Sequence, residues 1–108
     1  MLLSVISVFA DQIPLARQYS PNDRDERERY ENLNVRASLD NTTIFVNYSQ
    51  IISSSIEVVD LETGIVVAHE NCDSTSFTDI DISILTNGHY KLQISAFGYL
   101  WVGYFDVD

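Results

Sequence analysis

Apolar and polar residues alternate along much of this chain from Val35 onward. Alternation with a period of two places successive side chains on opposite faces of a β-strand. Several further runs are apolar and of strand length, and no run has the spacing of an amphipathic helix. The predicted strands cover residues 35–39, 44–48, 55–61, 65–69, 80–84, 90–96 and 99–107.

Turn residues separate these predicted strands at short intervals. Gly64 has a structural role in this interpretation, because glycine can adopt the positive φ that a tight hairpin requires. We expect loops in the serine-rich gap at residues 49–54 and again at residues 70–75. A bulge or a late strand start is expected near Thr78.

Many short strands with turns between them are typical of two sheets packed face to face. We therefore predict an all-β protein, a β-sandwich of about seven antiparallel strands, over residues 34–108. Residues 11–33 are expected to form a short edge strand at residues 13–17 followed by a charged connector. Pro14 excludes a central position for that strand, because proline lacks the N–H that a central strand donates.

The stretch LTNGHYKLQI contains a turn, supplied by Asn87 and Gly88, and a strand. Leu85, Gly88 and Tyr90 have the spacing of a tyrosine corner, in which the ring enters the core and the hydroxyl bonds to backbone upstream. His89 is the outward neighbour of Tyr90, and it would need an orienting carboxylate and a nucleophile to be catalytic. We expect structural roles for Gly88 and Tyr90 and a surface position for His89.

Composition and charge limit the functions that remain. Sixteen acidic residues against six basic residues give a net charge of −10, which repels nucleic acids and anionic lipids. The single cysteine, Cys72, cannot form an internal disulfide or a multi-cysteine metal site. Asp79 and Asp81 share a strand face but lack the loop of a calcium site. We expect no catalytic residue, no metal, no cofactor and no enzymatic activity.

The first ten residues, MLLSVISVFA, form an apolar segment. Val8 and Ala10 occupy the −3 and −1 positions of a cleavage site before Asp11, as in a secretory signal, although the usual positive charge is missing. The run is too short to cross a bilayer as a helix, so no membrane insertion is expected. Either the segment is removed on export to the periplasm or cell surface, or it stays as an edge strand that joins two copies into a homodimer.

Aromatic residues cluster in the last predicted strand, which is apolar on both faces. Such a strand is either central and covered on both sides, or it presents one side as a binding patch. Tyr99, Trp101 and Tyr104 are the candidate interaction residues, because an exposed Trp101 would suit stacking on a sugar or a protein interface. The expected partner is accordingly an unknown protein or carbohydrate.

Four motifs in order, ADQIPL, IEVVDLETGIVV, TDIDISILTNGHYKLQI and VGYFDV, resemble the DUF3244 family of small β-sandwich proteins from Bacteroides-type gut bacteria. The resemblance covers residues 10–108. It implies an immunoglobulin-like fold and an exported protein with no assigned activity. Asp73-Ser74-Thr75 also resembles a short O-glycosylation motif of Bacteroides-type periplasms, with Ser74 as the acceptor.

The strand pattern is similar as well to the carboxyl-terminal sorting domain of the type IX secretion system. That domain normally follows a large cargo and ends in basic residues, whereas this chain ends FDVD. We therefore predict a non-enzymatic, exported binding or interaction module of the cell envelope. The alternatives are a structural or sorting-domain-like accessory module, and a subunit that self-assembles through its N-terminal strand.

Overall fold

The computed structural model describes residues 11–19 and 32–108. These residues form strands, and all of the pairs between strands are antiparallel. The all-β prediction is therefore confirmed. Among the described residues there is no helix with the length and apolar character needed to cross a membrane. The strands are β1 (Asp11–Ile13), β2 (Ala16–Tyr19), β3 (Val35–Asp40), β4 (Thr43–Asp60), β5 (Val66–Asp81), β6 (Gly88–Ala96) and β7 (Tyr99–Val107).

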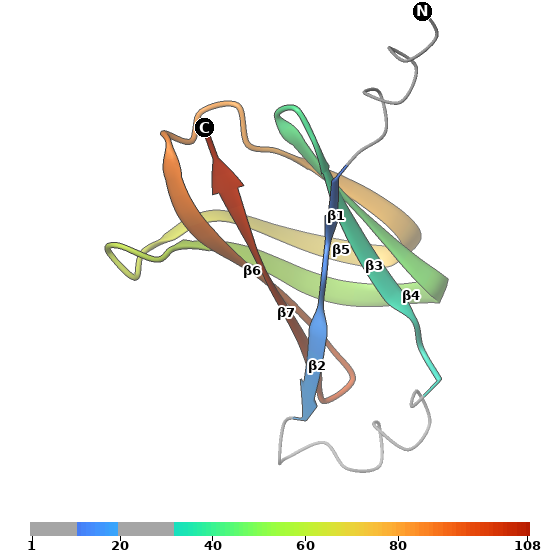
Figure 1. The fold of residues 1–108 in the computed structure, drawn as a ribbon. Coiled ribbons are helices and arrows are strands. Elements are labelled where there is room, and N and C mark those ends of the chain that lie inside the picture. Colours follow the sequence, from blue (N-terminus) through green and yellow to red (C-terminus); the bar gives the residue numbers. More distant parts are fainter. Residues whose placement is uncertain (1–10, 20–31) are drawn as a thin grey trace, which may run out of the picture.

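One continuous hydrogen-bonded sheet folds over on itself to make two layers (Figure 1). The long strands β4 and β5 belong to both layers. In the first layer, residues 43–48 of β4 lie between β3 and residues 77–81 of β5, and β1 extends the layer beyond β3. In the second layer, residues 55–60 of β4 lie between β6 and residues 66–71 of β5, and β7 and then β2 follow β6.

β4 and β5 cross from one layer to the other in the two stretches that the sequence predicts to be loops, residues 49–54 and residues 70–75. They run through these stretches as bent strands. Their register shifts between Thr75 and Phe77, close to the irregularity predicted near Thr78, and again between Cys72 and Thr75. The Ser53 hydroxyl donates to Asp73 Oδ1 at 2.8 Å and accepts from the backbone N–H of Ser74 at 3.1 Å. Ser74 itself has φ of 50°. Side-chain hydroxyls thus replace ladder hydrogen bonds at the bend, so the polar composition does not interrupt the strands.

The core lies between the layers and is built from the predicted alternating positions. Ile44, Ile56, Leu92 and Ile94 are fully buried, and they belong to one continuous apolar cluster. Burial of four such side chains contributes about 1.5–3 kcal/mol each to folding. The alternation that predicted the strands therefore also identifies the faces that meet.

Ile84, the last isoleucine of the predicted strand at residues 80–84, does not follow this pattern of burial. Ile80 and Ile82 are buried, but β5 ends at Asp81 and Ile84 is 85% exposed. The Asp81 carboxylate accepts a hydrogen bond from the backbone N–H of Ser83 at 2.8 Å, which turns the chain and holds the pKa of Asp81 below its usual value.

The predicted edge strand at residues 13–17 is instead two strands in different layers. β1 pairs with β3 and β2 pairs with β7, and the chain changes layer at Pro14 and Leu15. The sandwich therefore includes residues 11–13 and 16–19, which lie before the predicted boundary at residue 34. The rest of the connector (residues 20–31) and the segment 1–10 lie outside the described residues.

The structural predictions for Gly64, Tyr90 and Gly88 concern the turns before β5 and β6. Gly64 has φ of 75° in the β4–β5 turn, and its N–H donates to the carbonyl of Asp60 at 2.7 Å. Tyr90 is buried, and its hydroxyl donates to the Thr86 carbonyl at 2.6 Å, as a tyrosine corner requires. Gly88 is the first residue of β6 and has no left-handed φ, so the expectation that it supplies the turn is wrong.

Candidate binding face on the first layer

The aromatic residues predicted to meet a partner are mostly part of the core. Trp101 is 4% exposed and Tyr99 is 3% exposed, and their ring centroids lie 5.5 Å apart. β7 is paired on both sides and its inner face is covered by the first layer, which buries both rings. Neither ring can therefore stack on a ligand, which corrects the prediction. Tyr104 is 62% exposed on the outer face of the second layer and stays a candidate.

The outer face of the first layer presents a set of side chains that the sequence pattern did not identify as a site. Strand register aligns residues of β3, β4 and β5 in three rows across this face. We name it the β3–β4–β5 face. Its rows are Arg36, Asn47 and Phe77, then Ser38, Phe45 and Asp79, then Asp40, Thr43 and Asp81.

An aromatic pair lies in the middle of this face. The ring centroids of Phe45 and Phe77 are 6.0 Å apart, and their planes differ by 24°, which is an offset-stacked arrangement. Phe77 is 47% exposed and Phe45 is half-buried. The signal for them in the sequence is that each occupies the outward, polar phase of its strand. Phe45 lies between the buried Ile44 and Val46, and Phe77 precedes the half-buried Thr78.

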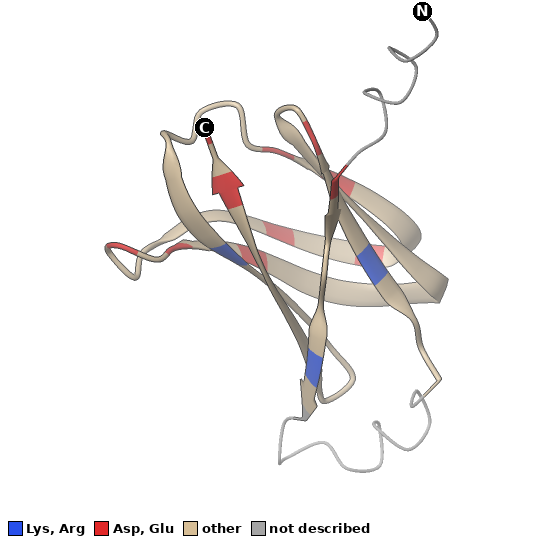
Figure 2. Cartoon of the chain, viewed as in Figure 1, with Lys and Arg blue, Asp and Glu red and all other residues tan. Residues whose placement is uncertain are grey.

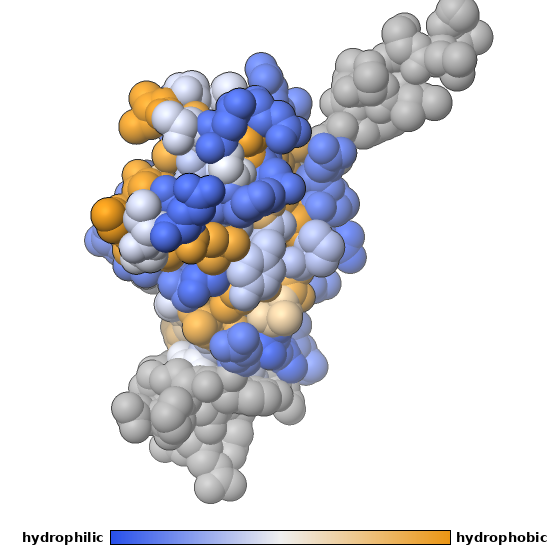
Figure 3. Space-filling model, turned by 60° about the vertical axis from the view of Figure 1, so that its left-hand side comes forward, coloured by the Kyte–Doolittle hydropathy of each residue, from blue (hydrophilic) through white to orange (hydrophobic). Residues whose placement is uncertain are grey.

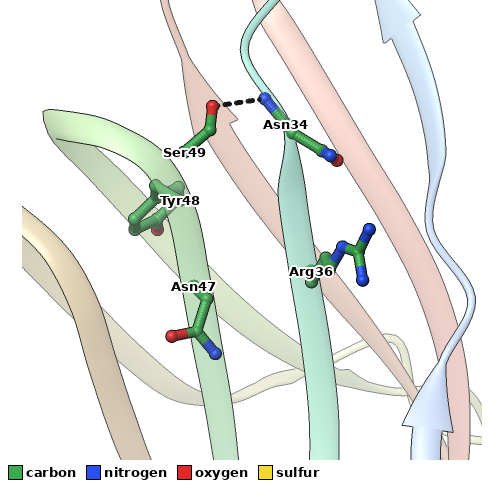
Figure 4. Close-up of a pocket in the computed structure, with 5 residues that line it drawn as sticks. All are labelled: Asn34, Arg36, Asn47, Tyr48 and Ser49. Carbon is green, nitrogen blue, oxygen red and sulfur yellow. Dashed lines mark hydrogen bonds between the residues drawn. The ribbon is translucent and has the colours of Figure 1, made fainter.

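A shallow recess adjoins the first row of this face (Figure 4). It is lined by Asn34, Arg36, Asn47, Tyr48 and Ser49 and has a volume of about 150 Å³. Ser49 Oγ accepts a hydrogen bond from the backbone N–H of Asn34 at 2.9 Å, and this contact fixes the end of β3 against β4. In Figure 4 the side chains of Asn34 and Arg36 extend to the same side, and Asn47 projects from the neighbouring strand. The recess therefore offers amide and guanidinium groups beside the aromatic pair.

His89 has a carboxylate partner that the sequence analysis did not identify. The β6–β7 register places Asp106 opposite His89, and Nδ1 lies 2.6 Å from Oδ1 of Asp106. The hydrogen bond to Asp106, and the charges of Asp106, Glu62 and Asp108, raise the pKa of the His89 imidazole. Both partners are exposed, so this is a surface ion pair.

The other sequence candidates lie apart from the β3–β4–β5 face. Ser74 is exposed at the bend of β5, so its O-glycosylation stays a prediction. Cys72 is buried at the same bend as a free thiol. Within the described parts of the chain, no three His, Cys, Asp or Glu side chains are grouped so that they could hold a metal ion.

Comparison with known proteins gives the family of this chain. A family model described as a domain of unknown function, DUF3244, matches residues 17–107. A crystal structure from Bacteroides vulgatus, described as a DUF3244 family protein with an immunoglobulin-like β-sandwich fold, has 19% sequence identity and a TM-score of 0.74. The similarity covers 93% of this chain and 100% of that one. No curated protein matches the chain. The chain therefore belongs to the DUF3244 family and has its immunoglobulin-like β-sandwich fold.

Proposed function

We propose that this protein is a non-catalytic binding module, exported to the periplasm or cell surface. The observation that carries the proposal is the exposed Phe77 ring, stacked on Phe45 among polar side chains of the β3–β4–β5 face. A large apolar side chain in the outward phase of a strand contributes little to the core. Its exposure together with a second ring is typical of a surface that contacts a partner.

His89 has one of the two partners that catalysis would require, the orienting carboxylate of Asp106. Among the described residues no serine, threonine or cysteine is hydrogen-bonded to its imidazole as a nucleophile. The side chains of His89 and Asp106 are 66% and 62% exposed. His89 and Asp106 are therefore best explained as a cross-strand pair that fastens the end of β7 to β6.

Amide chemical-shift mapping tests the binding role. We expect a soluble cell-envelope extract from the organism that encodes the protein to shift amide signals of the ¹⁵N-labelled chain in β3 and in the adjoining parts of β4 and β5. Such an extract contains both proteins and glycans, so the experiment does not depend on the ligand class. A spectrum that the extract leaves unchanged would contradict the binding role.

Self-assembly is the second candidate function, and the open edge of β5 favours it. Within the described residues β5 pairs with β4 alone, and next to its start Ile65 and Val66 are 60% and 46% exposed. Figure 3 views this end of the molecule and shows apolar surface interrupted by hydrophilic residues. A net charge of −10 opposes the approach of a second copy. Concentration-dependent shifts along β5 without any extract would support self-assembly instead.

Export is proposed from the sequence of the first ten residues. Val8 and Ala10 occupy the −3 and −1 positions of a cleavage site before Asp11. Cleavage there would leave every described strand intact. We expect the intact mass of the protein purified from its own organism to correspond to a chain that starts at Asp11. A mass that retains Met1 would contradict export by cleavage, and extra mass that a Ser74→Ala variant loses would identify the glycosylation site.

A further inference from the structure

We propose that the β3–β4–β5 face binds a neutral glycan, whose sugar rings stack on Phe77 and whose hydroxyls bond to Arg36 and Asn47. This inference deepens the proposed binding role and rests on it. The C–H face of a sugar ring is apolar, whereas its rim carries hydroxyls. A complementary surface therefore needs an exposed ring with hydrogen-bonding groups beside it.

The first row of the face supplies both kinds of group. Register places Arg36, Asn47 and Phe77 side by side on three neighbouring strands. Strands in a sheet are about 4.8 Å apart, so the three side chains lie within the reach of one or two sugar rings. Phe77 is 47% exposed, and Phe45 supports its ring from the next row. The side-chain amide of Asn47 both donates and accepts, and the guanidinium of Arg36 donates in a planar fork.

Arg36 is available for such a contact. It is exposed, and it makes no ion pair to any carboxylate within residues 11–19 and 32–108. Arg36 and Asn34 both line the recess, and in Figure 4 their side chains extend to the side of β3 opposite Asn47. A sugar that stacks on Phe77 can therefore place a hydroxymethyl group or a neighbouring unit toward this recess.

The size of the face argues against a folded protein as the partner. Three strands and five residues along each strand give a backbone frame of about 10 Å by 13 Å. A stable protein interface covers about 800 Å² on each partner and has a larger apolar centre. A short glycan needs only a small area, because its affinity comes from a few stacked rings and directed hydrogen bonds.

The charge of the face argues for a neutral glycan over an acidic one. The face carries one basic residue, Arg36, against the three carboxylates of Asp40, Asp79 and Asp81 (Figure 2). The whole chain has a net charge of −10. Uronic acids and sulfated sugars would be repelled, whereas neutral hydroxyls can donate hydrogen bonds to the carboxylates.

Native electrophoresis in gels that contain an immobilised polysaccharide tests the inference. The strongly acidic protein migrates readily toward the anode, so binding to the polysaccharide is measured as slower migration. The neutral probes are a mixed-linkage β-glucan, a xylan, a galactomannan and glycogen, and the acidic probe is polygalacturonate. We expect at least one neutral polymer to retard the protein and polygalacturonate to leave it unaffected. Retardation by polygalacturonate alone, or by no polymer, overturns the inference.

Variants locate the site and separate this inference from the broader binding role. Phe77→Ala and Arg36→Met should each weaken retardation about tenfold, and Phe77→Tyr should retain it. Tyr104→Ala tests the competing candidate, since it removes an exposed ring from the outer face of the second layer. If Tyr104→Ala abolishes binding and Phe77→Ala does not, the β3–β4–β5 site is wrong. The chemical-shift test with envelope extract then decides independently whether the protein is a binding module.

Discussion

Replacement of Gly103 by valine is expected to unfold the domain or to leave it barely stable. Gly103 lies in β7 beneath the segment where the chain crosses from β1 to β2. A Cβ atom added to it would lie 2.7 Å from both Ile13 Cγ2 and the Pro14 carbonyl oxygen, and 2.9 Å from Leu15 Cδ2. Side chains can rotate away from such a contact, but the Pro14 carbonyl belongs to the backbone that links the two layers.

The expected cost follows from this clash. Overpacking a core site typically costs about 1–3 kcal/mol, and alanine at residue 103 should reach the upper part of that range. Valine adds two more methyl groups, so its cost should exceed the range. Small domains have only about 5–15 kcal/mol of total stability. Urea unfolding followed by the fluorescence of Trp101 measures both variants.

Two other glycines provide matched controls, because Gly64 lacks the steric clash and Gly88 lacks both the clash and a left-handed φ. Gly64 has no atom within 4 Å of an added Cβ but has φ of 75°, so Gly64→Ala should cost about 1–2 kcal/mol from backbone strain alone. An added Cβ at Gly88 would meet the Tyr90 ring at 3.7 Å, an ordinary contact, and φ there is unexceptional. Gly88→Ala should therefore change stability by about 0.5 kcal/mol or less. If Gly103→Ala unfolds like Gly88→Ala, the crossing is looser than the structure indicates.

The importance of Gly103 could not be predicted from its own neighbourhood in the sequence. Alternation correctly places residue 103 on the inward face of its strand, but the atoms that crowd it belong to residues 13–15. Pro14 indicates an edge position, and the edge interpretation holds for both β1 and β2. What alternation cannot indicate is that the chain changes layer at Pro14, because that depends on contacts with strands far along the chain.

The distinction between contacts that are close in the sequence and contacts between distant strands also explains which features of the sandwich could be predicted. Strand faces, the hairpin at Gly64 and the corner at Tyr90 depend on residues close together in the sequence, and those predictions agree with the structure. The bends of β4 and β5 were read as loops, because serine and aspartate usually interrupt strands. At Ser53 the hydroxyl instead bonds across to β5, which requires the partner strand to be known.

The candidate site was missed for a related reason. The aromatic residues of β7 are clustered in the sequence, which predicts a binding patch there. Phe45 and Phe77 lie 32 positions apart by their numbers and meet only through the β4–β5 pairing. Each is apolar in the outward phase of its strand, and that was the available signal. Likewise the contact of His89 with Asp106 depends on the β6–β7 register.

Trp101 and Tyr104 of β7 should respond very differently to truncation, and this contrast tests the two-layer arrangement directly. Trp101 is 4% exposed and packs in the core, so Trp101→Ala should cost about 3–5 kcal/mol. Tyr104 points outward and is 62% exposed, so Tyr104→Ala should lie within about 0.5 kcal/mol of the unmodified protein. Circular dichroism during urea unfolding measures both, since Trp101→Ala removes the single tryptophan.

Iodide quenching of the unmodified protein gives an independent measure of the same burial. An enclosed Trp101 should be quenched weakly in the folded state and strongly after unfolding in urea. Strong quenching of the folded protein, or a Trp101→Ala variant as stable as Tyr104→Ala, would show that the first layer does not cover β7. Trp101 would then again be a candidate ligand-binding residue. The case for Phe77 as the principal aromatic contact would weaken, because the Trp101 ring would face solvent as well.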